Sequence, residues 1–208
     1  MIWFLRPGRF PHLLEVAYDG VVRRLLFRTI HDVALMLDRD RKSREQFPSA
    51  AVVDSQSIKA STAEKGGFDA GKKVVGRKRH IAADTDGWLL MVNLTAADIS
   101  DSAGAQAIVA AIRKLWPWLK RPFADCAYDR TRLMDAVGYR DFVLEIVRRT
   151  NKEPGFKVLA RRWLVERTFG WMTHWKRLVR DYKQRLDVSE AMIHVAPVSL
   201  IPRRIVNP

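Results

Sequence analysis

Three acidic residues stand at positions where a carboxylate could take part in catalysis. The first, Asp54, follows the run Ala50–Val53, whose small and β-branched residues predict a buried strand. A carboxylate near the end of such a strand needs a partner, which could be a helix N–H, an arginine or a metal ion. From this stretch alone, the alternative that Asp54 only caps a turn is equally open.

A second stretch repeats this pattern. Residues 122–124 are again short and apolar, and Asp125 follows them directly. Asp129 lies four residues later, where a helix is expected to begin, so an N-cap role fits it better. We therefore favour Asp125 over Asp129 as the functional carboxylate of this stretch.

The third carboxylate, Glu166, lies within one long helix predicted over residues 160–186. At about 3.6 residues per turn, one face of this helix carries the side chains expected in the core: Leu164, Thr168, Trp171, Trp175, Leu178 and Tyr182. Glu166 falls on the other face, with four further positions: Arg162, Thr173, Arg177 and Arg180. Arginines there could hold phosphates while Glu166 reaches a metal, or the face is simply exposed, with an ion pair between Arg162 and Glu166.

Together the three carboxylates predict a specific chemistry. Three acids can hold two divalent cations about 3.5–4 Å apart, which activates a water or a 3′-hydroxyl against a phosphodiester. Mg²⁺ suits this role because it prefers oxygen ligands and bridges to substrate phosphate. Asp54, Asp125 and Glu166 are therefore the expected metal ligands, with Mn²⁺ able to substitute for Mg²⁺.

Composition agrees with a nucleic-acid partner. The 208 residues contain 37 Lys and Arg against 23 Asp and Glu, a formal net charge of +14 that favours binding to a polyanion. Cys126 is the single cysteine, so the chain can form neither an internal disulfide nor a cysteine-based zinc site. Since no apolar run approaches the roughly 20 residues of a membrane span, we expect a soluble cytoplasmic or nucleoid-associated protein.

The elements that must position these acids follow from the hydrophobic pattern. A helix is expected from Thr29, with Ile30, Val33, Ala34 and Leu37 on its apolar face, and it should run into a solvated charged linker over residues 38–45. Residues 60–76 read as a flexible cationic loop. The expected elements that follow are a hairpin over 76–95 with its turn at Asp84–Gly87, a helix over 103–115 capped by Ser100–Ser102, a helix through Leu133 that stops at Gly138, and a strand over 142–147.

Four motifs resemble those of a known family. They are Ala51–Lys59 around Asp54, Gly76–His80 before the hairpin, Phe123–Asp129 around Asp125, and Arg161–Trp171 around Glu166. In this order they resemble the bacterial insertion-sequence DDE transposases, and more narrowly the branch typified by insertion sequence five within the insertion sequence four superfamily. The resemblance covers about residues 30–195. It implies an α/β, ribonuclease-H-like mixed sheet flanked by helices, and Mg²⁺-dependent cutting and joining of DNA.

Carried over by position, the resemblance gives Asp54, Asp125 and Glu166 as the catalytic triad. Arg162 matches the arginine that stands four residues before the glutamate in the family's Tyr-Arg-Glu-Lys signature. The chain departs from this signature at its first and last positions, where it has Leu159 and Thr173, although Lys176 follows one helical turn later. Residues 1–28 do not resemble the longer DNA-binding region of the family, which implies a divergent or truncated N-terminal part.

The expected organisation is therefore a partly helical N-terminal segment over residues 1–47, a catalytic domain over 48–195 and a tail over 196–208. The expected partners are the terminal repeats of the element and the target DNA, both double-stranded, with no membrane contact. Because two DNA ends must be brought together, a homodimer is expected on DNA. The residues expected to contact DNA phosphates are basic: Lys72, Lys73, Arg77, Lys78, Arg79, Arg162, Lys176, Arg177 and Arg180.

Two rival functions remain at this point. A DNA-binding remnant without catalysis would share the fold and the charge, but its binding would ignore Mg²⁺ and the substitution Asp54→Asn. A ribonuclease-H-like nuclease would cleave DNA without joining strands.

Overall fold

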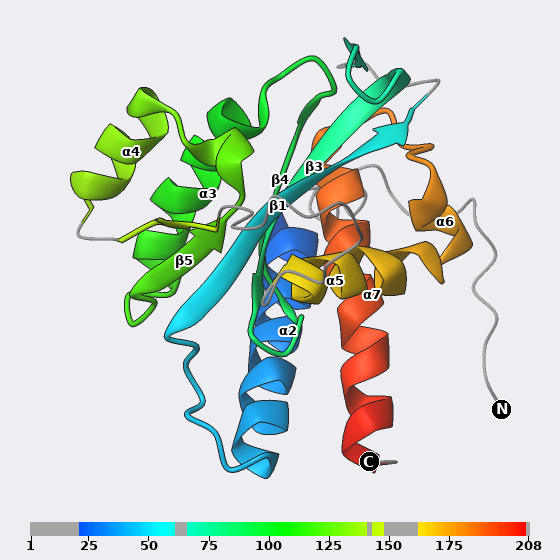
Figure 1. Ribbon diagram of the computed structural model, residues 1–208. Helices are drawn as coiled ribbons and strands as arrows, with labels where there is room; N and C mark the ends of the chain where they lie inside the picture. Colours follow the sequence, from blue (N-terminus) through cyan, green and yellow to red (C-terminus); the bar gives the residue numbers. More distant parts are fainter. Residues whose placement is uncertain (1–20, 61–65, 141–142, 148–161, 207–208) are drawn as a thin grey trace, which may run out of the picture.

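A computed structural model gives the structure of the chain and describes residues 21–60, 66–140, 143–147 and 162–206 (Figure 1). Its strands are β1 (Ala50–Lys59), β2 (Gly67–Asp69), β3 (Val74–Asp84), β4 (Leu89–Ala96), β5 (Arg121–Ala124) and β6 (Glu145–Ile146). Its helices are α2 (Val21–Arg41), α3 (Asp101–Leu115), the 3₁₀ turn η1 (Cys126–Tyr128), α4 (Thr131–Gly138), α5 (Arg162–Thr173), α6 (Lys176–Val179) and α7 (Leu186–Val206).

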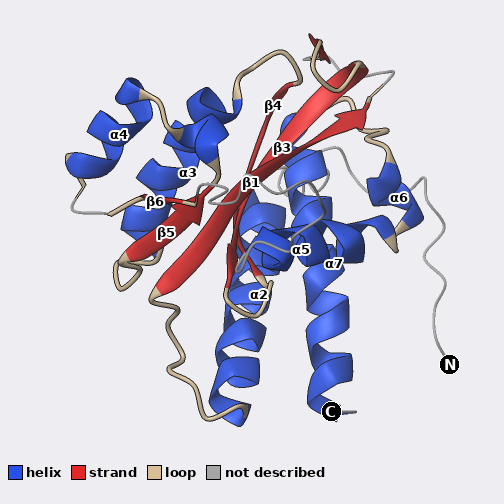
Figure 2. Cartoon of the chain, viewed as in Figure 1, coloured by secondary structure: helices blue, strands red, loops and turns tan. Residues whose placement is uncertain are grey.

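The strands form one mixed sheet in the order β2-β3-β1-β5-β6, with β4 also paired to β3. Strand β3 runs antiparallel to β1 and β4, whereas β5 runs parallel to β1 and β6 runs parallel to β5. The predicted hairpin is confirmed as β3 and β4, and its turn places Gly87 at a φ of +76°, which favours glycine. The sheet and its helices confirm the predicted ribonuclease-H-like architecture (Figure 2).

Helices cover both faces of the sheet. On one face, Ala51 and Val53 of β1 pack in a core cluster with residues of α3 and α4. On the other face, Val52 packs in a second cluster with Val165 of α5 and Ile193 of α7. Successive side chains of a strand point to opposite faces, so β1 contributes to both clusters. Figure 1 shows α3 and α4 on one side of the sheet and α5, α6 and α7 on the other.

Helix α2 differs from its prediction in both its start and its buried face. It begins at Val21, eight residues before the predicted start at Thr29. Three residues of the expected core face are exposed instead, with Ile30 at 41%, Val33 at 50% and Leu37 at 57%. The buried face carries His31, Leu35 and Asp38, because α2 packs against α7 as well as the sheet. The predicted face was chosen by hydrophobicity, but the buried face of α2 includes the polar residues His31 and Asp38, which have partners inside the protein.

The charged run after Leu37 begins as helix and is a linker only from Lys42 onward, where most residues are exposed as predicted. The helix continues to Arg41, and both Asp38 and Arg39 are buried. Arg39 Nη1 donates to Asp84 Oδ2 at 2.8 Å, while Asp38 accepts from Trp88 Nε1 at 2.9 Å. Burial by itself would raise the pKa of Asp38, but its hydrogen bonds outweigh this and lower it. These contacts fasten the end of α2 to the β3–β4 turn.

The predicted long helix over residues 160–186 is wrong. The chain forms α5 and the short α6, and it takes extended conformations at Trp175 and at Arg180. Arg177 and Arg180 therefore do not share the helical face of Glu166, and Lys176 starts a new helix instead of following Thr173 by one turn. Thr168 and Leu178 are buried as expected, whereas Tyr182 is 58% exposed.

Helix α7 was not predicted. It passes through residue 195, where the sequence predicted the end of the catalytic domain, and its Ile201 lies in the same core cluster as Leu35. The C-terminal residues down to Val206 are therefore helical, although they were expected to form a tail. Among the described helices, none combines the length and the apolar composition that a membrane crossing requires.

Close packing between α3 and β3 gives a prediction for stability. A Cβ atom added at Gly104 would lie 2.1 Å from the Cε1 and Nε2 atoms of the fully buried His80. Alanine in a helix is usually about 1 kcal/mol more favourable than glycine, but overpacking of this kind costs about 1–3 kcal/mol. We expect Gly104→Ala to lower the free energy of unfolding, measured by urea denaturation.

The matched control lies on α5. A Cβ atom at Gly170 meets nothing within 4 Å, so Gly170→Ala should raise the free energy of unfolding by up to about 1 kcal/mol. Equal effects of the two substitutions would contradict the packing of Gly104 on His80.

Candidate active site

Asp54 is the fifth residue of β1 and not its last. On one side of β1 the pairing with β3 continues past it, with Asp54 opposite Ile81. On the other side the pairing with β5 stops at Val52, which lies opposite Phe123. Asp54 is half-buried as a result, because its strand continues while the neighbouring strand has ended. The prediction of a strand end at Asp54 is therefore correct for the β5 side only.

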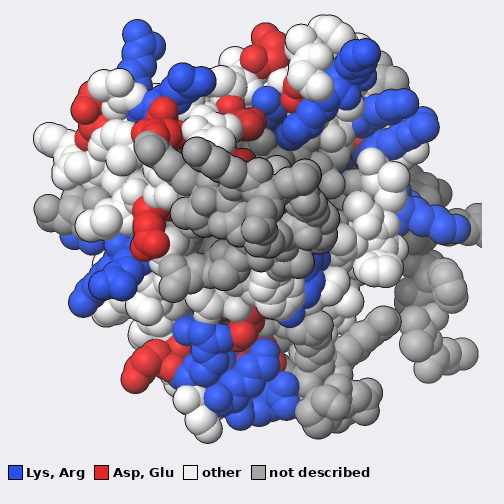
Figure 3. Space-filling model, in the orientation of Figure 1, with Lys and Arg blue, Asp and Glu red and all other residues white. Residues whose placement is uncertain are grey.

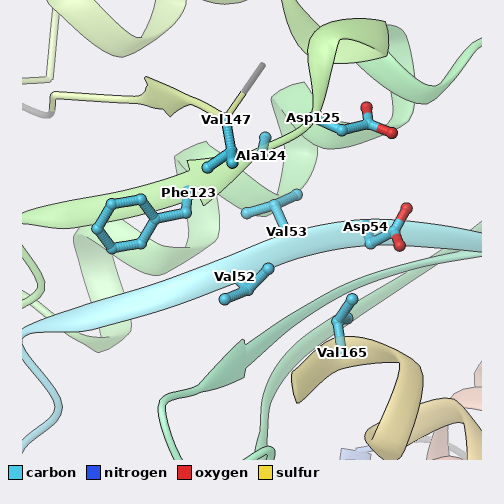
Figure 4. Close-up of a pocket in the computed structure, with 8 residues that line it drawn as sticks. All are labelled: Val52, Val53, Asp54, Phe123, Ala124, Asp125, Val147 and Val165. Atoms are coloured by element: carbon cyan, nitrogen blue, oxygen red, sulfur yellow. The ribbon is translucent and has the colours of Figure 1, made fainter. Parts of the chain in front are cut away.

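Asp125 is level with Asp54 across this opening. It lies two residues beyond Phe123, just as Asp54 lies two residues beyond Val52, the partner of Phe123. Neighbouring strands are about 4.8 Å apart, so the shared register keeps the two residues side by side. A pocket lined by Val52, Val53, Asp54, Phe123, Ala124, Asp125, Val147 and Val165 lies here. Figure 4 shows both carboxylates at the same end of this pocket.

Backbone donors orient both carboxylates. Asp54 Oδ1 accepts a hydrogen bond from the N–H of Ser55 at 2.7 Å, and Asp125 Oδ1 accepts one from the N–H of Ala127 at 2.9 Å. Tyr128 is buried close by, and burial raises its pKa well above the usual value, with further increases from the negative charges of Asp54, Asp101 and Asp125. Negative charge is thus concentrated around this end of β1 and β5.

The expected N-cap role belongs to Asp125 and not to Asp129. Asp125 caps η1 through the bond to Ala127, while α4 begins after Arg130, whose side chain makes no cap bond. Asp129 is exposed at the end of η1. The short 3₁₀ turn, which the sequence analysis missed, moves the start of α4 two residues beyond Asp129 and leaves Asp125 beside Asp54.

Glu166 lies on the neighbouring helix but is not part of this pair. Its predecessor Val165 is fully buried and lines the pocket, whereas Glu166 is exposed on α5. Within the part of the chain that the structure describes, no three His, Cys, Asp or Glu side chains lie close enough to hold one metal ion. The structure therefore brings together two of the three predicted ligands, and the third lies one residue from the pocket wall.

The chemistry of the pair fits a divalent cation. Two carboxylates supply the hard oxygen ligands that Mg²⁺ and Mn²⁺ prefer, and Mg²⁺ is usually held by only one or two protein carboxylates together with water and substrate phosphate. A cation at Asp54 and Asp125 would also neutralise the negative charge that acts on Tyr128. Bound there, it would supply Lewis acidity toward a phosphodiester.

The predicted DNA contacts at Arg77, Lys78 and Arg79 need correction. All three side chains are buried, with exposed fractions of 0% for Arg77, 6% for Lys78 and 1% for Arg79. Their charges are balanced by partners inside the protein. Arg77 Nη1 donates to Asp181 Oδ2 at 2.8 Å, and Arg79 Nη2 donates to the carbonyl of Leu178 at 2.7 Å. Burial lowers the pKa of Arg79 to about 10, so it still carries its charge at neutral pH. Arg77 and Arg79 thereby fasten β3 to α6 and the segment that follows it. None of the three side chains faces solvent.

Five of the other basic residues predicted to contact DNA lie at the surface. Those with exposed side chains are Lys72, Lys73, Lys176, Arg177 and Arg180. The predicted cationic loop contains β2 within its described part, and Lys72 donates its backbone N–H to Asp69 Oδ1 at 3.0 Å. Arg162 begins α5, but its side chain lies outside the described residues, as do residues 148–161. Contact of these residues with DNA stays a prediction.

One polar cluster was missed by sequence reasoning. On the face of β1 opposite Asp54, Lys78 Nζ lies 3.1 Å from Asp101 Oδ1 and 3.4 Å from Asp69 Oδ2. Ser55 and Ser57 donate to these same carboxylates, at 2.7 Å and 2.5 Å. The Ser57 hydroxyl lowers the pKa of Asp69 to about 2, with Lys78 adding to the effect. The alternation of Asp54 with two serines along β1 was the available signal for this second polar face.

Comparison with known proteins gives the family. The family model described as the transposase DDE domain matches residues 45–201. A candidate transposase of insertion sequence element IS402 from Burkholderia cepacia is 32% identical over 126 residues, which cover 57% of this chain and 59% of that protein. The chain thus matches about three fifths of the length of this relative.

Two solved structures are similar in fold. One is a chain of the simian T-cell lymphotropic virus intasome in complex with the PP2A regulatory subunit B56 gamma, with a TM-score of 0.47, 17% identity, and coverage of 71% of this chain and 48% of that one. The other is the catalytic core domain of BIV integrase, with a TM-score of 0.43, 11% identity, and coverage of 73% and 82%. The family model matches well over half of the residues of the present chain, and the chain therefore belongs to the transposase DDE domain family.

Proposed function

We propose that the chain is the catalytic part of a DNA transposase that cuts DNA at the ends of an insertion sequence and joins them to a target. In the first step, water attacks the phosphorus at the element's end and the 3′-oxygen leaves as a hydroxyl. In the second step, this 3′-hydroxyl attacks a phosphodiester of the target and displaces its 3′-oxygen. Divalent cations, Mg²⁺ or Mn²⁺, would assist both displacements.

One observation carries this proposal. Asp54 and Asp125 come from two parallel strands and lie level at one end of a pocket, in a chain of the transposase DDE domain family. Two oriented carboxylates at an opening in a basic protein suit a metal-assisted reaction of a polyanion. Glu166 would complete the set through a shift of α5, since its neighbour Val165 already lines the pocket.

The test is a cleavage and joining assay with the full chain. Labelled duplex DNA that carries the ends of the chain's own insertion sequence is incubated with Mg²⁺, Mn²⁺ or EDTA. Nicked ends and joined products are expected with either cation, and none with EDTA. Nicking without any joined product would support instead a nuclease that does not join strands.

A second candidate function is a DNA-binding remnant without catalysis. The observation that favours it is the exposed position of Glu166, away from the carboxylate pair. It predicts salt-sensitive DNA binding that is the same with Mg²⁺ and with EDTA, and no cleavage. The transposase proposal in turn predicts that Glu166→Gln slows nicking.

We expect the proposed transposase to act on nucleoid DNA in the bacterial cytoplasm, as a homodimer on the paired ends.

A further inference from the structure

A basic pocket lies farther along β1, beyond the carboxylates. It has a volume of about 380 Å³, and three cationic residues line it, Lys59, Lys73 and Arg180. The uncharged part of its wall includes Tyr182 and Val75, which are 58% and 64% exposed. Figure 3 shows Lys and Arg side chains gathered over this end of β1 and β3.

The acidic residue of the wall does not offset this charge at the pocket. Asp181 is 5% exposed, and its carboxylate accepts hydrogen bonds from Arg77 at 2.8 Å and from Ser189 at 2.7 Å. Its charge is balanced inside the protein. The pocket therefore presents cations and one aromatic ring to solvent.

Buried contacts hold the walls of this pocket in place. Arg79 donates to the carbonyl of Leu178 and Arg77 to the carbonyl of Lys183, which fixes the segment on both sides of Arg180 and Tyr182. The N–H of Asp181 donates to the carbonyl of Lys59 at 2.9 Å, which joins this segment to the end of β1. The positions of Lys59, Arg180 and Tyr182 are thus set before any ligand arrives, which lowers the entropic cost of binding.

The composition of the pocket points to a nucleotide. Its volume falls within the range of about 300–1,000 Å³ typical of small-ligand sites and exceeds what a phosphate needs. Cations that track a backbone, with an aromatic ring on which a base can stack, are the usual features of a site for an unpaired strand. We propose that this pocket binds one unpaired nucleotide of a DNA strand, with its phosphate among Lys59, Lys73 and Arg180 and its base against Tyr182.

The position of the pocket relates it to the carboxylates. Lys59 follows Asp54 by five residues of strand, which is about 16 Å at roughly 3.3 Å per residue. At about 3.4 Å per stacked nucleotide, this separation corresponds to roughly five nucleotides of one strand. The inference rests on the proposed function, because that function supplies the DNA strand whose reacting phosphate lies at Asp54.

The test compares an oligonucleotide with and without bases. Affinity is measured by fluorescence anisotropy for a labelled single-stranded 12-mer of thymidine nucleotides and for a 12-mer of abasic residues, at low salt and with the full chain. Tyr182→Ala should weaken binding of the thymidine strand about 10-fold, the effect of losing one stacked base, and leave the abasic strand unchanged. Tyr182→Phe, which keeps the ring, should bind both strands as the unchanged chain does.

The role of the cationic side chains is tested by affinity and its salt dependence. Lys73→Ala and Arg180→Ala should each weaken binding of both strands and reduce the slope of log affinity against log salt by about 0.7, the value for one phosphate contact on a single strand. Tyr139→Ala is the matched control, because Tyr139 is a 90% exposed tyrosine at the end of α4 and should not affect binding. Equal loss for the thymidine and abasic strands with Tyr182→Ala, or no loss for either, would overturn the proposal.

The outcome is separable from the cleavage assay. Binding is measured without Mg²⁺, so it requires no catalysis. A base-dependent loss with Tyr182→Ala in a chain that never cuts DNA would leave the pocket in place and reject the proposed function. Normal cutting together with an unchanged affinity in Tyr182→Ala would reject only the pocket.

Discussion

Replacing Asp54 or Asp125 with asparagine is expected to slow DNA nicking by about 1,000-fold or more. A bound metal ion stabilises the transition state by several kcal/mol, and each 1.36 kcal/mol corresponds to about tenfold in rate. Asparagine keeps the Oδ1 atom that accepts the N–H of Ser55 or of Ala127, so the local backbone should keep its conformation. The measurement is the rate of nicking of labelled element ends at saturating Mg²⁺.

Asp129→Asn is the matched control for this prediction. Asp129 is exposed at the end of η1, four residues after Asp125, and should tolerate the change with a rate near that of the unchanged chain. DNA binding by the Asp54→Asn and Asp125→Asn chains should remain, since neither carboxylate supplies a positive charge. Nicking at more than a tenth of the normal rate in Asp54→Asn would remove Asp54 from the catalytic set.

The largest loss of stability is expected from Arg77→Met. Arg77 is fully buried and donates to Asp181, to Ser189 and to the carbonyls of Lys183 and Gln184. Removing one partner of a buried ion pair costs about 3–5 kcal/mol, because the other charge is left buried without compensation. The free energy of unfolding of a domain is only about 5–15 kcal/mol, so urea denaturation should show a large shift in midpoint.

Two further variants show whether this loss comes from the ion pair. In the double variant Arg77→Met with Asp181→Leu, part of the stability should return, because no isolated charge remains. Arg177→Met changes an exposed arginine on α6 and should alter the free energy of unfolding by less than about 0.5 kcal/mol. An Arg77→Met chain of normal stability that binds DNA more weakly would restore the DNA contact predicted from the sequence.

Structural features that one short stretch of residues determines could be predicted from the sequence. The hairpin follows from its Asp-Gly turn, and α3 follows from Ser100, whose side chain accepts the N–H of Ala103 at its start. The small apolar runs before Asp54 and Asp125 predicted a carboxylate after each of two short strands, and these strands are β1 and β5. Each of these features depends on local rules of turn, cap and strand composition. That the two strands pair in parallel, and so bring the carboxylates side by side, is seen only in the structure.

The burial of charged residues could not be predicted, because it depends on partners far away in the sequence. Arg77 and Arg79 look like surface cations in a basic motif, but their acceptors, Asp181 and the carbonyl of Leu178, come from about 100 residues later in the chain. The same holds for Asp38, whose buried carboxylate accepts a hydrogen bond from Trp88, 50 residues later in the chain. The pattern of charged and hydrophobic residues along the sequence does not show such pairings. Hydrophobic periodicity likewise predicted one continuous helix, although the helix is interrupted at Trp175.

The register between β1 and β5 also determines which changes of chain length the site tolerates. Asp54 and Asp125 are level because Val52 lies opposite Phe123, and the 70 residues between the two acids do not enter into that relation. Insertions or deletions at the turns between β1 and β5 would therefore leave the two carboxylates level. A single residue inserted between Val52 and Asp54 would instead turn Asp54 to the opposite face of the sheet. The spacing that matters for this pair is two residues long, and it occurs once on each strand.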